Sequence, residues 1–305
     1  MRANAAGPRA SKQHFGIHRI DEHDLPLDAT ALSSELQARL ASPSYTPPIL
    51  PSAAVRILEL SRAPNASMRE LVGLFEDDAM LAARVLKTAR SASFVSDPDR
   101  VRTLQDAAVR LGLKTLRDVV LDVSLNSKIF RSPVYSSAME SLFRHARAVA
   151  RITKVVCRLT SVASDDAFVA GLFHDVGAVV LLHVLSETRR DSPLPVDEAW
   201  PAIMELHQAA GAQVARAWKL SHEVVGAVES HHGMAETEDA RLAAALYVAD
   251  TLAGELSFSA APSPALLEPK SELMSRRARG LLELDAEQEA LLRTHALEAV
   301  SGLDA

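Results

Sequence analysis

The stretch FVAGLFHDVGAVVLLHVL (residues 168–185) is almost wholly apolar, and two polar side chains, His174 and Asp175, interrupt its middle. No alternation of apolar and polar residues marks it as a half-buried strand, and its length favours a helix. We therefore expect residues 164–185 to be helical, with His174 and Asp175 at the end of an apolar helix. The apolar runs on either side of His174 and Asp175 are too short to span a bilayer.

The composition of the whole chain favours the same kind of structure. Aromatic residues make up only 4% of the 305 residues, whereas 48% are hydrophobic. Ala, Leu, Arg and Glu, which stabilise helices, are common, and the aromatic residues that favour strands are scarce. We expect an all-α protein. A chain of this length is long enough to form two packed subdomains.

Charge and cysteine content exclude several classes of protein. The net charge is −6 and no long run of Lys or Arg is present, so we expect no DNA partner. The first residues lack the apolar segment of a signal peptide, and we expect no membrane partner. The single cysteine, Cys157, permits no intrachain disulfide and fits a reducing compartment. We therefore expect a cytoplasmic protein.

Helical patterns recur along nearly the whole chain. A capping box, Thr103-x-x-Asp106, opens one helix, and Gly112 is expected to end it. Roughly five short helices are expected between residues 48 and 130. The other expected helices cover residues 29–41, 136–159, 197–218, 221–232 and 239–255, with two further helical patches in the tail after a Pro- and Ser-rich linker at 260–269.

Seven polar residues interrupt these helices within apolar surroundings. A buried carboxylate is costly unless it is paired or bound to a metal, and imidazole with carboxylate is a common ligand pair for divalent transition metals. The seven candidates for metal ligands are His145, His174, Asp175, His207, His231, His232 and Asp250.

Each candidate taken alone also has an ordinary explanation. Asp175 could cap a helix, and Asp250 could bond to a buried hydroxyl. His231 and His232 could compensate the dipole of a helix that ends at Gly233. Taken together the residues indicate more, because five helices each contribute a His or Asp. Helix bundles build metal sites in this manner, with ligands that project inward from facing helices.

The order of these residues resembles the ligand pattern of the HD superfamily of metal-dependent phosphohydrolases. The segment FVAGLFHDVGAVVLL looks like its signature helix, and HQAAGAQVARAWKLSHEVVGAVESHHG (residues 207–233) looks like a second block. In this resemblance His145, His174-Asp175 and Asp250 match the superfamily pattern. The interposed His207 and His231-His232 are similar to the extra ligands of the HD-GYP branch.

The N-terminal half resembles the helical lead-in of HDOD domains, a branch of the same superfamily. The similar strings lie at residues 49–95 and 102–121, and the similarity covers roughly residues 46–256. It implies a two-lobed all-α HDOD fold whose C-terminal lobe is HD-phosphohydrolase-like. We expect a tail and helix at 1–46, an HDOD domain at 47–258 with lobes at 47–132 and 133–258, and a linker and helical tail at 259–305.

The sequence departs from the active enzymes of this superfamily at two places that bear on activity. The residues after His231-His232 read GMAETED, without a Gly-Tyr-Pro motif. Ala178 stands where active relatives usually carry a lysine, a natural electrostatic partner for a phosphate in the transition state. Smaller departures are Ser221 in place of a proline and Arg90 in place of an asparagine.

The resemblance leaves two classes of function open. HDOD domains are generally regarded as signalling modules without catalytic activity, which implies a regulatory protein that binds a protein of a signalling pathway or a nucleotide second messenger. The alternative is a phosphohydrolase that acts on a nucleotide or cyclic dinucleotide.

The alternative requires two divalent metal ions of iron, manganese or zinc. One set of ligands would be His145, His174, Asp175 and Asp250, and the other Asp175, His207, His231 and His232. A metal centre that ties the helices together without catalysis is a third arrangement compatible with the same residues.

Overall fold

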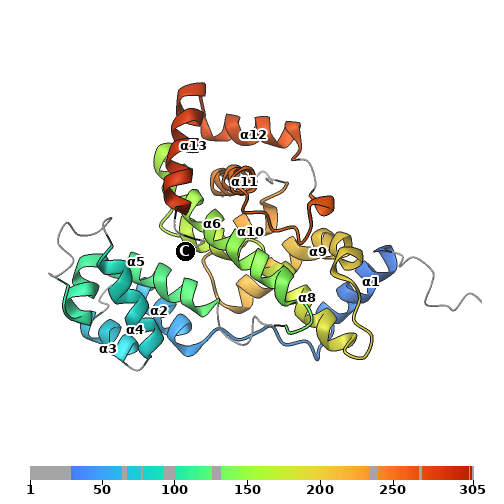
Figure 1. The fold of residues 1–305 in the computed structure, drawn as a ribbon, viewed down its shortest axis with the longest axis horizontal. Helices are drawn as coiled ribbons and strands as arrows, with labels where there is room; N and C mark the ends of the chain where they lie inside the picture. Colours follow the sequence, from blue (N-terminus) through green and yellow to red (C-terminus); the bar gives the residue numbers. More distant parts are fainter. Residues whose placement is uncertain are drawn as a thin grey trace, which may run out of the picture.

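The computed structural model describes residues 29–63, 67–76, 78–91, 101–125, 132–233, 240–267, 270–301 and 303. The expected N-terminal tail before residue 29 lies outside this part of the chain. The described residues form helices, turns and loops and contain no strand, which confirms the all-α class. The helices gather into a smaller and a larger group, seen side by side in Figure 1.

The smaller group is the N-terminal lobe, in which α5 packs against the three helices before it. Its core includes the fully buried side chains of Ile57, Leu71, Phe75 and Leu116. The four helices are α2 (Ser52–Arg62), α3 (Met68–Glu76), α4 (Ala79–Ala89) and α5 (Leu104–Ser124).

The larger group is built on two helix pairs, α8 with α9 and α6 with α7, and α11 packs against α6. The expected helix at residues 136–159 is confirmed at both ends. The helices of this lobe are α6 (Ser136–Leu159), α7 (Ala167–Phe173), α8 (Val176–Thr188), α9 (Val196–Ala217), α10 (His222–Ser230) and α11 (Ala240–Glu255).

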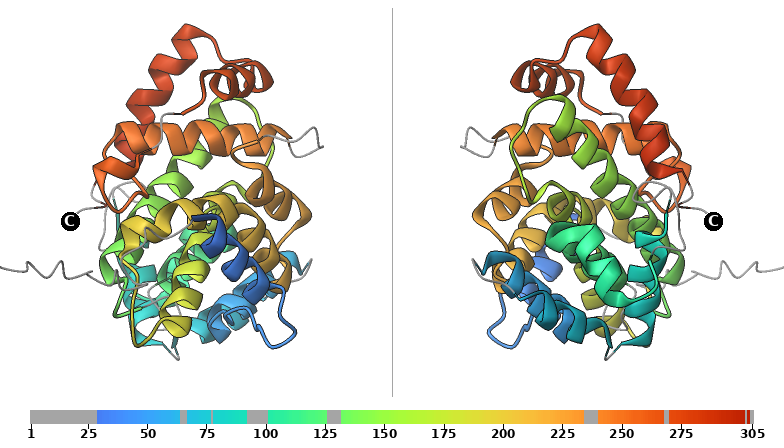
Figure 2. Two further views of the ribbon diagram at one scale, coloured as in Figure 1. Left: turned by 90° about the vertical axis from the view of Figure 1, so that its right-hand side faces the viewer. Right: turned by 90° about the vertical axis from the view of Figure 1, so that its left-hand side faces the viewer.

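Both ends of the described chain also lie on the larger lobe. Helix α1 (Ala29–Leu40) packs against α8 and α9, and the chain then crosses to α2 without further helix (Figure 1). After a short turn of 3-10 helix, α12 (Glu272–Leu282) packs against α11 and α13 (Ala286–Val300) against α6. Figure 2 shows α12 and α13, joined by a short loop, at one end of the molecule.

The segment of residues 167–188 forms the centre of the larger lobe. By length and mean hydropathy (1.9) it is apolar enough to cross a membrane, yet 89% of its most apolar window is buried inside the protein. Burial of this extent is typical of a helix in the core of a protein. The first part of the segment, α7, packs against α6, and its second part, α8, packs against α9.

The helical stretch expected over residues 164–185 consists of two helices, α7 and α8, with a turn at His174 and Asp175, where the end of an apolar helix is expected. Neighbouring side chains on a continuous helix point in different directions. The turn instead lets His174 Nε2 lie 3.3 Å from Asp175 Oδ2. The break therefore aims two adjacent residues at one point.

The two halves of α5 are divided at Gly112. The expected capping box is present at its start, where the Thr103 hydroxyl accepts from the Asp106 amide and the Asp106 carboxylate accepts from the Thr103 amide. Gly112 has φ +71°, in the left-handed region that glycine occupies without strain. Gly112 ends the first half as expected, but the chain resumes as helix directly after it.

A buried ionic seam joins α5 to the larger lobe. The Arg117 guanidinium donates to the carboxylate of Asp166 (2.7 Å) and to the carbonyl of Asp165 (2.6 Å). Lys154 Nζ donates to Asp118 Oδ2 (2.8 Å). Burial raises the pKa of Asp118, and Lys154 opposes that shift. Buried ion pairs add little net stability, but their geometry fixes how the two lobes meet.

Gly177 permits the close approach of α8 and α9. A Cβ atom at this position would lie 1.9 Å from the His207 carbonyl oxygen and 2.5 Å from the Gly211 amide nitrogen. We expect Gly177→Ala to lower the free energy of unfolding by about 3 kcal/mol or more, because both obstacles are backbone atoms that cannot rotate away. Urea unfolding followed by circular dichroism measures this.

The control is Gly73→Ala in α3, where a Cβ atom would meet nothing within 4 Å. A helix-interior glycine loses more backbone freedom on folding than alanine, so this variant should be stabilised by about 0.5–1 kcal/mol. Equal effects at the two positions would contradict the packing described for Gly177.

Cys157 is buried in α6, and burial raises the pKa of its thiol to about 12. Because the thiolate is the reactive form, we expect Ellman's reagent at pH 8 to detect no thiol in the native protein and one in denaturant. Rapid labelling of the native protein would show that this part of α6 opens.

Candidate metal centre

All seven candidate ligands converge in the interior of the larger lobe. His145 lies on α6, His207 on α9 and Asp250 on α11, while His174 and Asp175 form the turn between α7 and α8. His231 and His232 follow the last residue of α10. Six of the seven side chains are buried, and His232 is half-buried.

The first group surrounds one oxygen of Asp175. His145 Nε2 lies 3.2 Å from His174 Nε2 and 3.7 Å from Asp175 Oδ2, and His174 Nε2 lies 3.3 Å from the same oxygen. Asp250 extends the group, since its Oδ1 lies 3.3 Å from His145 Nε2. These are the side chains of α6, α11 and the turn before α8.

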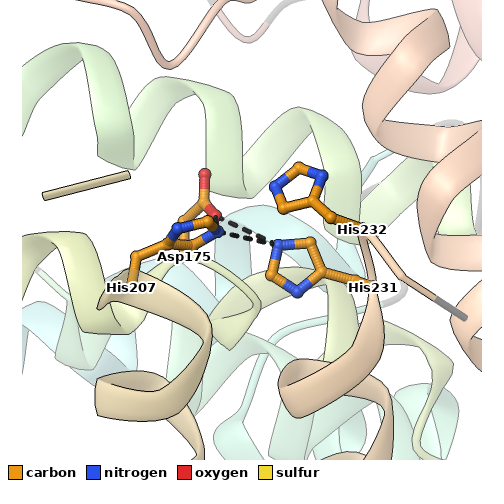
Figure 3. A group of neighbouring side chains, drawn as sticks. All are labelled: Asp175, His207, His231 and His232. Atoms are coloured by element: carbon orange, nitrogen blue, oxygen red, sulfur yellow. Dashed lines mark hydrogen bonds and ion pairs between the residues drawn. The ribbon is translucent and has the colours of Figure 1, made fainter. Parts of the chain in front are cut away.

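The second group surrounds the other oxygen of Asp175. His207 Nε2 and His231 Nε2 are 3.2 Å apart, and each lies 3.5 Å from Asp175 Oδ1 (Figure 3). The ring centre of His232 lies 4.2 Å from that of His231 and 5.0 Å from that of His207. Asp175 is therefore shared by both groups.

Backbone carbonyls fix the tautomer of four of these imidazoles. A carbonyl oxygen accepts only, so each Nδ1 beside one must carry the hydrogen. In its neutral form, a ring held in this way presents the bare lone pair of Nε2 to the cluster. The four pairs are His145 with the Phe258 carbonyl (2.6 Å), His174 with Gly171 (2.9 Å), His207 with Met204 (2.6 Å) and His231 with Val228 (2.7 Å).

The convergence of these lone pairs demands a positive charge. Nε2 atoms that face one another at 3.2 Å, as His145 does with His174 and His207 with His231, repel unless a proton or cation lies between them. Asp175 Oδ1 is also buried without a hydrogen-bond donor. A buried acceptor left without a partner costs free energy, so this arrangement fits bound cations.

The ionisation states of the candidate ligands also favour a bound cation. Burial lowers the pKa of His207 to about 4 and, with the help of His231, that of His232 to about 2, so both rings are neutral ligands at pH 7. Burial alone would raise the pKa of Asp175, but the charge of His174 beside it outweighs burial and holds this pKa well below its ordinary value. Burial lowers the pKa of His174, but Asp175 outweighs it and raises that pKa, so a bound metal would take the place of the His174 proton. Neutral imidazoles and ionised carboxylates are the forms that bind metals.

Two ligand sets for divalent ions are thus present among the described residues. One combines His145, His174 and Asp175, with Asp250 beside it, and the other Asp175, His207, His231 and His232. Imidazole with carboxylate suits iron, manganese or zinc. Such an ion, when bound, lowers the pKa of a coordinated water.

The sequence interpretation missed Lys270, which lies just before α12. Its ammonium forms an ion pair with Asp250 Oδ2 and lies 5.8 Å from the ring centre of Tyr247. A lone lysine beside a linker gives no sequence signal, because only the folded chain brings it to Asp250. The loop after α11 also supplies the Phe258 carbonyl that orients His145. This C-terminal segment therefore supports the first group.

A small cavity borders Asp175 on the side away from the histidines. It has a volume of about 10 Å³, close to the minimum for one water molecule, and Asp175 alone of the seven candidates lines it. Ala178, where active relatives carry a lysine, is fully buried. No ammonium is therefore present at that position.

The family comparison agrees with this arrangement of helices. A family model described as the HDOD domain matches residues 48–234, which includes six of the seven candidate ligands and excludes Asp250. Among curated proteins, no match to the sequence was found.

Solved structures from three bacteria share the fold. An HDOD domain protein of unknown function from Geobacter sulfurreducens is 22% identical with a TM-score of 0.66, and the match covers 90% of this chain and 96% of that one. A protein from Shewanella amazonensis SB2B, provisionally assigned as a metal-dependent phosphohydrolase, is 18% identical with a TM-score of 0.68, covering 91% and 99%.

The third structure, from Marinobacter aquaeolei VT8, is provisionally assigned to signal transduction. It is 21% identical with a TM-score of 0.63, and the match covers 92% of this chain and 65% of that one. Identities of this size establish the fold and leave the activity of this chain open.

The two ligand groups predict separable losses of metal. Because Asp175 is shared, we expect Asp175→Ala to lose both ions, His145→Ala to lose one and His207→Ala the other. Protein purified without chelator and loaded with iron, manganese or zinc in turn should bind about two equivalents in its unaltered form. Mass spectrometry of the metal content measures all four proteins.

The matched control is His295→Ala, a histidine on α13 that pairs with Glu298 far from the cluster. This variant should retain the full metal content. If all four variants and the unaltered protein hold no metal while folding alike, the two ligand groups do not form a metal centre.

Proposed function

The chain belongs to the HDOD family, and from that premise we propose that it is a regulatory module of a signalling pathway with a closed, non-catalytic metal centre. Its metal ions hold α6, α9, α11 and the turn before α8 in one arrangement. A protein of the pathway or a small signal then recognises the surface that this arrangement presents. The reducing cytoplasm is the compartment that we propose for it.

The observation that carries this proposal is the burial of the ligand cluster, in which six of the seven candidate side chains are buried. A hydrolase must bring its substrate to the metal-bound water, whereas only His232 of the seven is partly exposed to solvent. Ala178 also leaves no ammonium at the position where active relatives place one. The ligands are therefore suited to binding metal and poorly suited to turning over a phosphate ester.

The second candidate function is a phosphohydrolase acting on a nucleotide or cyclic dinucleotide. The observation that favours it is the shared carboxylate, with Oδ1 of Asp175 facing one histidine pair and Oδ2 the other. Two-metal hydrolases use closely spaced ions to stabilise both oxygens of a displacement. This function would require the centre to open for substrate.

Removal of metal by a chelator tests whether bound metal stabilises the fold. A ligand that binds only the folded state stabilises it, by roughly 2.7 kcal/mol for each site saturated at a hundred times its Kd. We expect dialysis against a chelator to lower Tm by roughly 5 °C or more. Readdition of metal should restore Tm, and Asp175→Ala should show no such response.

An activity assay then separates the two candidates. The metal-loaded protein is incubated with bis-p-nitrophenyl phosphate and with cyclic dinucleotides, and we expect no turnover above the Asp175→Ala variant. Hydrolysis that disappears in Asp175→Ala and persists in His295→Ala would favour the phosphohydrolase. A Tm that ignores chelator would overturn the structural role of the metal, whatever the activity.

A further inference from the structure

A second, much larger cavity lies where the two lobes meet, about 910 Å³ in volume. Its walls come from the C-terminal end of α2 and the kink of α5 in the smaller lobe, and from the first turns of α7 and α10 in the larger lobe. The volume lies within the usual range for small-molecule sites, roughly 300–1,000 Å³. None of the seven metal-ligand candidates lines it.

Charged side chains at this cavity leave one positive charge without a partner. Lys114 forms an ion pair with Asp165, and Arg117 forms one with Asp166. Arg62 is the remaining charged residue of the lining. Its guanidinium forms no ion pair or hydrogen bond within the described residues. Three cations against two carboxylates give the lining a net charge of +1.

The carboxylates of Asp165 and Asp166 repel an anion less than unpaired carboxylates would, because each is in an ion pair. Asp166 accepts from both the Arg117 guanidinium (2.7 Å) and the Ser221 hydroxyl (2.5 Å). Asp165 is neutralised by Lys114 at the surface. The residual charge therefore suits a single negative charge, and a guanidinium fork binds a carboxylate through two parallel hydrogen bonds.

The uncharged part of the lining is mostly aliphatic, with the hydroxyls of Ser61, Thr115 and Ser221. The buried aliphatic residues in its walls are Leu58, Leu111, Val169, Leu220 and Val224. No aromatic side chain among the described residues lines the cavity, so it offers no ring on which a nucleobase would stack. Aliphatic walls instead match a flexible hydrocarbon chain, which gains free energy in proportion to the apolar area removed from water.

We propose that this cavity binds an aliphatic carboxylate, with its hydrocarbon chain against the leucine and valine side chains and its carboxylate at Arg62. The lining comes from both lobes, so an occupant contacts both at once beside the Gly112 kink. Such a ligand would favour one relative arrangement of the lobes, as a small signal must. The binding itself does not depend on the metal centre or on the regulatory role proposed above.

The test is titration calorimetry of the full chain with decanoate, below the concentration at which decanoate forms micelles. Decyltrimethylammonium carries the same chain with the opposite charge, and adenosine monophosphate carries a phosphate with an aromatic base. We expect one decanoate per chain and no saturable binding of the other two probes.

Two variants locate the site. Arg62→Gln removes the guanidinium from an exposed position and should weaken decanoate binding about tenfold or more, since hydrogen bonds to charged groups are the stronger ones. Ser61→Trp places a large ring in the cavity and should abolish binding. Arg69→Gln, an exposed arginine of the same lobe outside the cavity lining, should bind like the unaltered protein.

Each outcome bears on the proposal. Binding that Arg62→Gln weakens and Arg69→Gln leaves unchanged supports it, even if Ser61→Trp fails to fold in circular dichroism. Equal binding of decyltrimethylammonium, preferential binding of adenosine monophosphate, decanoate binding insensitive to Arg62→Gln, or no binding of any probe would each overturn it. Metal content and phosphodiester hydrolysis are not read in this experiment, so its failure is distinct from failure of the metal-centre proposal.

Discussion

The larger lobe is organised around one buried carboxylate, that of Asp175. An ionised carboxylate in an apolar interior is among the costliest groups to bury, and it is tolerated only with compensating positive charge. Here the adjacent His174 and histidines of three other segments bring Nε2 atoms to 3.3–3.7 Å from its two oxygens, where they can hold the compensating proton or cation. The helices that carry these histidines must therefore meet at the turn between α7 and α8.

Small residues make that meeting possible. A Cβ atom at Gly171 would lie 2.5 Å from the Ala150 Cα atom, and one at Gly177 would lie still closer to α9. The backbones of α6 and α9 thus approach the turn from two sides. Backbone carbonyls then hold the imidazoles in one tautomer. The same packing therefore brings the helices together and orients the ligands.

Two places in the described part of the molecule use charge in opposite ways. At Asp175 one carboxylate oxygen is buried without a hydrogen-bond donor and histidine Nε2 atoms converge on it, so the arrangement attracts cations. Between the lobes, cations outnumber carboxylates by one, the space is large, and the walls are aliphatic. The helices of the larger lobe contribute to both, and this places a candidate signal site and a candidate metal centre on the same packed elements.

The sequence by itself determined the helical class, the helix bounds to within a few residues and the identity of the seven polar residues that meet in the core. These features depend on local periodicity, composition and spacing, which can be read directly from the amino-acid sequence. The tertiary structure alone decided which histidines face each oxygen of Asp175, the role of Lys270 against Asp250, and the cavity between the lobes. Each of these arises from contacts between residues distant in sequence, such as Lys114 with Asp165, which no local pattern encodes.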